Sequence, residues 1–219
     1  MTPEAIAAQI EAEIAALPAA YTPQLRDLRK LWSLELKPQP AANVIAVTRA
    51  LEQASPQERK WVAYELVRFH PAAFAAIDQT EVEGFAGRIA SWYATDAFGT
   101  VLSGPLWARG RLPDDMFDGW SRSDSRWLRR SALVATVGRN AVKPDPARTF
   151  ELCLRLADDR DDMVEKAVSW ALRYLSQKDR AAVEAFWAVH AARFRPRVQR
   201  EVRHKLATGV KNPRRTAGS

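Results

Sequence analysis

Proline is the residue type that most constrains this chain, because seven prolines each stand at the start of an amphipathic segment. Proline fits the first turn of an α-helix, where its missing N–H would have no intrahelical partner, and it is unfavourable further in. The segments that follow run for roughly 10 to 16 residues with apolar residues at helical spacing, and few stretches alternate as strands do. The sequence therefore predicts an all-α fold. Ser55 and Glu58 also have the spacing of a capping box, which predicts a helix that begins after Ser55. The seven prolines are Pro3, Pro23, Pro56, Pro71, Pro113, Pro146 and Pro196.

A faint internal repeat occurs in the second half of the chain. Segments 128–132, 164–168 and 198–202 share an apolar-x-basic-x-apolar frame, with offsets of 36 and then 34 residues. Periods of this size are typical of stacked helical hairpins, which form a superhelix with one helix of each pair on the concave side. The repeat predicts that Arg130, Lys166 and Arg200 form a row along that surface. Coincidence in a chain rich in Arg and Ala is the alternative.

The length of 219 residues favours one domain with a substantial core. We expect a single helical-repeat domain over residues 1–209. The remaining segment, 210–219, reads VKNPRRTAGS and is too polar to pack. It is predicted to be a flexible basic tail.

Basic residues are concentrated in the second half of the chain. Residues 1–106 hold 9 Lys and Arg against 12 Asp and Glu, a net charge of −3, whereas residues 107–219 hold 24 against 14, a net charge of +10. Of the 33 basic residues, 25 are arginine, whose planar guanidinium suits bidentate contact with phosphate. This asymmetry favours a polyanionic partner and does not distinguish DNA, RNA and an acidic protein.

Several classes of protein and site are disfavoured by the sequence. There is no run of about 18 apolar residues, and the acidic start MTPEAIAAQIEAEI does not resemble a signal peptide. The lone Cys153 is expected in the core, and His70, His190 and His204 lie too far apart for metal-ligand spacing. No glycine-rich phosphate loop is present. We therefore expect a cytoplasmic protein without a metal, a cofactor or a membrane contact.

Three stretches combine aromatic and charged residues, and the first is SRWLRRSALV. Arg126 and Arg130 are one helical turn apart, and Trp127 is spaced i, i+3 from Arg130, so the three can share a helix face. An indole beside two guanidinium groups suits a nucleic-acid backbone. The alternative is that Trp127 packs inward while the arginines pair with nearby aspartates.

The second stretch is SWYATD, in which Trp92 and Asp96 are spaced i, i+4. In a helix, this spacing places a carboxylate beside an indole. A carboxylate desolvated in this way is a strong local negative charge, useful where positive charge develops on a substrate. Alternatively, Asp96 is the N-cap of a helix that follows it.

The third stretch is VEKAVSWALRYL, in which Lys166, Trp170 and Arg173 are spaced i, i+4, i+7. They form a basic, aromatic and basic stripe on one face of the predicted helix. Burial of Trp170 with the apolar residues of this helix is the alternative.

Taken in order, the three stretches resemble the HEAT-like-repeat, AlkD-type family of DNA alkylation-repair glycosylases. The likeness covers residues 91–175 and rests on W-x3-D, then W-x6-W-x2-R beginning at Trp120, then KA-x2-W-x-L-R. It implies stacked helical repeats with a basic concave groove for duplex DNA, and hydrolysis of the N-glycosidic bond of purines alkylated at N3 or N7. It also implies that Asp96 is the catalytic carboxylate, that Trp92 and Trp170 flank the deoxyribose, and that Arg130 grips the DNA backbone.

The DNA-binding residues expected beside Arg130 are Arg126, Trp127, Lys166, Arg173 and Arg200, and the expected partner is duplex DNA with alkylated bases. A protein of this kind is expected to be a monomer associated with the nucleoid. Two other functions stay open. One is a non-catalytic repeat protein that binds damaged or branched DNA through the same groove, since some members of the family lack the aspartate. The other is a helical scaffold for an acidic protein.

Overall fold

The structure is a computed structural model that describes residues 1–17 and 22–210. Within these residues every regular element is a helix, so the predicted all-α class is confirmed. The elements are α1 (Pro3–Ala15), α2 (Thr22–Leu36), α3 (Ala41–Ala54), α4 (Lys60–Arg68), α5 (Pro71–Ala76), α6 (Gln79–Ala86), α7 (Trp92–Ala97), the π-helix η1 (Phe98–Ser103), α8 (Gly104–Ala108), α9 (Asp114–Ser121), α10 (Arg126–Val142), α11 (Pro146–Arg155), α12 (Asp162–Leu175), α13 (Arg180–His190), the 3-10 helix η2 (Ala191–Arg193) and α14 (Pro196–Thr208).

Six of the seven prolines stand within one residue of a helix start, as predicted, whereas Pro56 lies four residues before α4. Pro3, Pro71, Pro146 and Pro196, for example, are the first residues of α1, α5, α11 and α14. The capping box predicted at Ser55 is wrong. Ser55 is the C-cap of α3 and its Oγ donates a hydrogen bond to a carboxylate of α1, whereas α4 begins only at Lys60, with Arg59 as its N-cap.

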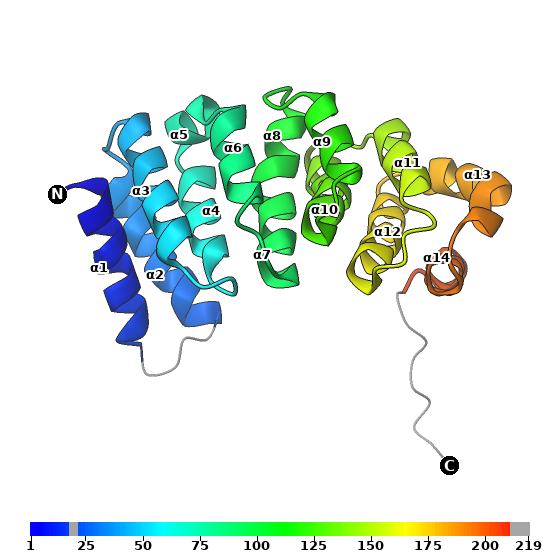
Figure 1. The fold of residues 1–219 in the computed structure, drawn as a ribbon, viewed down its shortest axis with the longest axis horizontal. Coiled ribbons are helices and arrows are strands. Elements are labelled where there is room, and N and C mark those ends of the chain that lie inside the picture. Colours follow the sequence, from blue (N-terminus) through cyan, green and yellow to red (C-terminus); the bar gives the residue numbers. More distant parts are fainter. Residues whose placement is uncertain (18–21, 211–219) are drawn as a thin grey trace, which may run out of the picture.

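The helices stack side by side into an elongated array with α1 and α14 at opposite ends (Figure 1). We call α4, the continuous helix α7–η1–α8, α10, α12 and α14 the central row, because each packs against the next. In Figure 1, α5, α6, α9, α11 and α13 lie above α4, α7, α10, α12 and α14. The chain is therefore an all-helical repeat fold.

The three repeated segments fall on successive helices of the central row. Segments 128–132, 164–168 and 198–202 lie in α10, α12 and α14, and α12 packs against both of the others. Their apolar positions are mostly buried, with Val164, Val168, Val198 and Val202 all at most 1% exposed. The repeat thus marks structurally equivalent helices.

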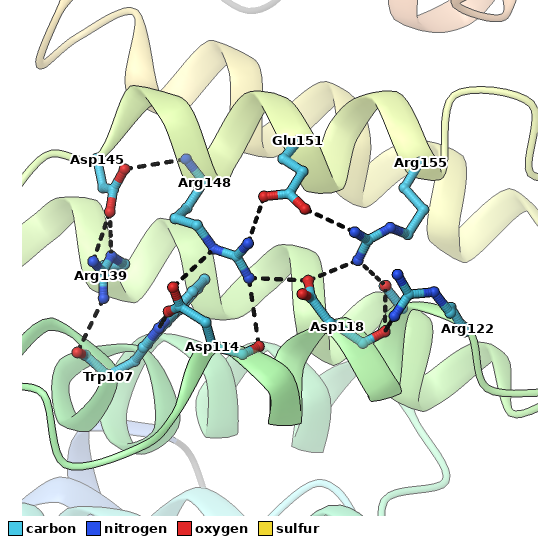
Figure 2. Close-up of polar contacts among 10 residues, drawn as sticks. Trp107, Asp114, Asp118, Arg122, Arg139, Asp145, Arg148, Glu151 and Arg155 are labelled. Carbon is cyan, nitrogen blue, oxygen red and sulfur yellow. Dashed lines mark hydrogen bonds and ion pairs between the residues drawn. The ribbon is translucent and has the colours of Figure 1, made fainter.

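The α9 and α11 helices are joined by a network of ion pairs, shown in Figure 2. Asp118 of α9 accepts from Arg148 Nη2 at 2.9 Å and from Arg155 Nη1 at 2.7 Å, both from α11. Glu151 lies between the two arginines and accepts from Arg155 at 2.8 Å. Although burial opposes the effect, hydrogen bonds and charge from Arg155 and Arg148 hold the pKa of the Asp118 carboxyl below its usual range.

Other sequence expectations concern the core, the tail and the membrane. Cys153 is fully buried in α11, as expected. Helix α14 ends at Thr208, followed by Gly209 in the left-handed conformation (φ 74°) that favours glycine at a helix end. The predicted tail lies outside the described residues except for its first residue, Val210. None of the described helices is long and apolar enough to cross a membrane.

Candidate functional site

Asp96 lies inside a helix, one turn after Trp92. The helix α7 begins at Trp92, and its N-cap is Ser91, whose Oγ accepts a hydrogen bond from Ala94 N at 3.3 Å. The chain continues from α7 into η1 and α8 without a break, so Asp96 does not start a new helix. The alternative of an N-cap role for Asp96 is therefore wrong.

Glycines let the α7–η1–α8 helix approach α10 unusually closely. A Cβ at Gly99 would lie 2.6 Å from Val134 Cγ1, and a Cβ at Gly104 would lie 2.4 Å from Ala135 O. On the facing helix, a Cβ at Gly138 would lie 2.3 Å from Gly99 O. Backbone therefore meets backbone at this contact, which brings the side chains at the near ends of the two helices within reach of each other.

Arg130 of α10 holds Asp96. Its Nη2 and Nε donate to Asp96 Oδ1 at 2.7 and 3.0 Å, and its Nη1 donates to the carbonyl of Met163 at the start of α12. The Arg130 side chain is 6% exposed, whereas that of Asp96 is 25% exposed. Asp96 Oδ2 has no hydrogen-bond partner among residues 1–17 and 22–210. The carboxylate is thus fixed through one oxygen, and the other is available.

The environment of Asp96 is unusual for an ion-paired carboxylate. Burial raises the pKa of the Asp96 carboxyl above its usual range, although the charge and hydrogen bonds of Arg130 act in the opposite direction. Shifted carboxyl groups of this kind are common at functional sites and also occur in structural ion pairs. The cavity beside Asp96 favours a functional site over a structural ion pair, because it leaves space for a ligand next to the carboxylate.

A cavity of about 370 Å³ lies beside Asp96, and it is lined by residues of α7, α10, α12 and α14 in the central row. Five of the residues that line it belong to the predicted site, so α12 presents its predicted stripe to the same cavity as the carboxylate. Trp170 is half-buried and Lys166 exposed, and Lys166 Nζ pairs with Asp162 at 2.6 Å. The lining residues are Asp96, Arg130, Lys166, Trp170, Arg173 and Glu201.

Arg173 lies on the cavity wall next to α14. Its Nε donates to Ser169 Oγ at 3.0 Å, and its Nη2 lies 3.5 Å from Glu201 Oε2. Burial lowers the pKa of the Arg173 guanidinium below its usual value, and Glu201 partly offsets this effect. Glu201 and Ser169 were not predicted from the sequence. The repeat indicated this part of α14, because the third repeated segment, 198–202, contains Glu201 beside the predicted Arg200.

The other predicted residues lie outside this cavity. Arg200 is exposed and lines a different surface cavity along α14, so the predicted row of basic residues extends to Lys166 and not beyond it. Arg126 pairs with Asp161 at 3.2 Å, and its guanidinium carbon lies 5.1 Å from the ring centre of the half-buried Trp127. Trp127 therefore packs partly against the core while its ring also contacts Arg126.

Trp92 is 43% exposed and stacks on Tyr93, with ring centres 3.6 Å apart. Tyr93 lines a second cavity of about 480 Å³, between α2, α4 and the α7–η1 helix, whose wall includes Trp61. The stacked pair thus lies at the start of the helix that carries Asp96, and Tyr93 shares its cavity with the indole of Trp61. This second cavity was not predicted.

A larger cavity, of about 500 Å³, lies between α1 and α2 and holds no residue of the predicted site. Size does not assign the site. A carboxylate, an indole and cationic groups also line the second cavity, for example Glu65, Trp61 and Arg59. The cavity of Asp96 is distinguished by the five residues of the predicted site that line it. Within the described ranges, no group of three or more His, Cys, Asp and Glu side chains could hold a metal ion.

The fold and this cavity together define an all-helical repeat protein with a carboxylate, an indole and a cluster of cationic side chains along its central row. Residues 13–206 match the sequence model of the family described as DNA alkylation repair enzyme. The chain therefore belongs to the DNA alkylation repair enzyme family, as its sequence motifs predicted, and this membership supports a role in DNA alkylation repair.

One solved structure similar to this chain is described as a predicted DNA alkylation repair enzyme from Enterococcus faecalis. It superposes with a TM-score of 0.68 at 22% sequence identity, over 86% of this chain and 87% of the other. This likeness supports the fold. No protein of curated function matches the chain in sequence.

Proposed function

We propose that this protein hydrolyses the N-glycosidic bond of purines alkylated at N3 or N7 in duplex DNA. The observation that carries the proposal is the cavity in which the Asp96 carboxylate, held by Arg130, lies with the half-buried indole of Trp170 and the cations Lys166 and Arg173. Family membership supports the same reading.

The chemistry requires little beyond what this cavity offers. An alkylated purine already carries a positive charge, so it leaves with the electron pair of its bond to C1′ and needs no general acid. The sugar then carries positive charge, which a carboxylate and a facing indole stabilise. Water adds to C1′ and loses a proton. Asp96 Oδ2 is the oxygen available to orient this water, because both hydrogen bonds from Arg130 go to Oδ1.

The roles of the remaining residues belong to the same proposal. We assign Trp92 and Trp170 to the two sides of the deoxyribose. Lys166 is the exposed cation of the cavity and suits a phosphate contact. Arg130 fixes Asp96, and we also assign to it the contact with the DNA backbone that the family resemblance implies. The other residues proposed to bind DNA are Arg126, Trp127, Arg173 and Arg200.

The test compares Asp96→Asn with Asp124→Asn on methylated duplex DNA. Asp124 is exposed and its side chain has no hydrogen bond or ion pair among the described residues, so it controls for the same change of charge. We expect single-turnover release of 3-methyladenine and 7-methylguanine to fall by about 10²-fold or more in Asp96→Asn, as for loss of one electrostatic group at a reacting centre, and to persist in Asp124→Asn. Release by the unmodified protein no faster than spontaneous depurination would refute the proposal.

A second candidate function is non-catalytic binding of damaged or branched DNA. The observation that favours it is the ion pair itself, since Asp96 and Arg130 would then serve only to tie α7 to α10. This function predicts DNA affinity that falls steeply with salt, weakens in Lys166→Ala and changes little in Asp96→Asn, without base release. Salt-independent affinity would reject it.

A further inference from the structure

Another cavity lined by cationic side chains lies at the C-terminal end of the helix that carries Asp96. Its volume is about 360 Å³, and it lies where the end of α4, the short helix α5 and the segment after α8 meet. Asp96 and Arg109 are thirteen residues apart along this helix, roughly 20 Å at 1.5 Å per residue. The cavity is therefore separate from the candidate site. Its lining residues are Arg68, Pro71, Phe74, Ala75, Arg109 and Arg111.

Two guanidinium groups of this cavity are held against one aromatic ring. The guanidinium carbons of Arg68 and Arg109 lie 4.6 and 5.3 Å from the ring centre of Phe74, which is itself buried. Arg109 Nη1 also donates to Pro105 O at 3.0 Å. Stacking and this hydrogen bond restrict the two long side chains, so less entropy is lost when they bind a ligand together.

None of the three arginines has a carboxylate within 4.0 Å in the described part of the chain, whereas Arg139, Arg148 and Arg155 are each paired. Burial and the charge of Arg109 both lower the pKa of the Arg68 guanidinium, and no carboxylate opposes them.

Two helix ends supply part of the missing negative charge. Arg68 ends α4 and Arg109 is the C-cap of α8. Each helix C-terminus carries only about half a negative charge, which leaves three guanidinium groups largely uncompensated.

We propose that this cavity binds a phosphate group. The planar guanidinium fork matches the oxygens of phosphate, and charge-assisted hydrogen bonds to it are strong. A phosphate would compensate the charge of Arg68, Arg109 and Arg111 at once. The phosphate belongs either to a small phosphorylated compound or to the backbone of a nucleic acid, and the recognition chemistry is the same for both.

The test is calorimetric titration of the full chain with inorganic phosphate at constant ionic strength. We expect Arg68→Gln and Arg109→Gln each to weaken phosphate affinity about tenfold, the usual effect of losing one charge-assisted contact. Arg122→Gln is the matched control, because Arg122 is the C-cap of α9 and its Nη1 likewise donates to a carbonyl four residues earlier, at 3.3 Å (Figure 2). Affinity within about twofold of the unmodified protein is expected for this control.

Absence of phosphate binding, or an equal loss of affinity in Arg122→Gln, would overturn the proposal. Competition identifies the source: displacement of phosphate by an undamaged duplex assigns the site to a nucleic-acid backbone, and retention of phosphate assigns it to a small phosphorylated compound. Asp96→Asn should bind phosphate as well as the unmodified protein does, so failure of this site and failure of the proposed glycosylase are distinguishable.

Discussion

Replacing Gly138 with alanine should separate the two helices that hold Asp96 and Arg130. The new Cβ would lie 2.3 Å from Gly99 O and 3.0 Å from both Pro105 Cδ and Thr100 Cα, whereas ordinary contacts begin near 3.4 Å. Because the closest atom belongs to the backbone, it cannot rotate away. The α7–η1–α8 helix must therefore move from α10 by about 1 Å at this point, the difference between the required and available distances.

The magnitude follows from two opposing effects. Overpacking of this kind costs about 3 kcal/mol, the upper part of the usual range, because backbone meets backbone on both sides. Alanine in a helix recovers about 1 kcal/mol relative to glycine. The net loss in the free energy of unfolding is about 2 kcal/mol, which corresponds to a decrease in Tm of about 4–8 °C for a chain of this length.

Urea unfolding followed by circular dichroism measures this effect, with Gly119→Ala as the matched control. Gly119 also lies within a helix, but a Cβ there would meet no atom within 4 Å. Gly119→Ala should therefore raise the free energy of unfolding by about 0.5–1 kcal/mol. If Gly138→Ala unfolds at the same urea concentration as the unmodified protein or a higher one, the close approach of the two helices is not as described.

Arg130→Gln should move the acid limb of base release to higher pH, because it removes the charge and hydrogen bonds that lower the pKa of Asp96 and leaves the burial that raises it. The pH profile of single-turnover release tests this, and Arg126→Gln should leave the limb in place, since Arg126 contacts Asp161 instead. Asp118→Asn should destabilise the protein at pH 7 and progressively less as the pH falls, because the lowered pKa of Asp118 makes its contribution present above the usual carboxyl range and lost on acidification. Urea unfolding at several pH values measures this difference, and a constant difference would contradict the assignment. Cys153 should resist thiol reagents at pH 8 in the folded protein and react in urea, since complete burial raises the pKa of its thiol. Rapid labelling of the native protein would contradict its burial.

Much of the fold follows from local signals. Proline positions and apolar spacing predict the helices because both act within a few residues, through backbone geometry and one-sided burial. The same locality explains the failed capping box. Ser55 and Glu58 have the spacing of a capping box, but Ser55 is the C-cap of α3, its Oγ donates to Glu11 of α1, 44 residues away, and α4 begins only at Lys60. The spacing of a serine and a glutamate does not report where the next helix begins.

The candidate site shows the same division between local sequence signals and contacts that form only in the folded protein. Helical spacing correctly places Trp92 and Asp96 on one turn and groups Lys166, Trp170 and Arg173 on one face of α12. It gave no sign of the second aromatic cavity at Tyr93, because that cavity forms between three helices.

By itself, the sequence determined the helical class, the equivalence of α10, α12 and α14, and the side-chain types available on each helix face. Tertiary structure decided which faces meet. Arg130 was expected on an exposed face with Arg126, but the close glycine contact between α7–η1–α8 and α10 buries it against Asp96. In α14, Glu201 and not Arg200 lines the cavity. Periodicity specifies the angle of a side chain about its own helix axis, whereas the partner at that angle depends on how two helices pack.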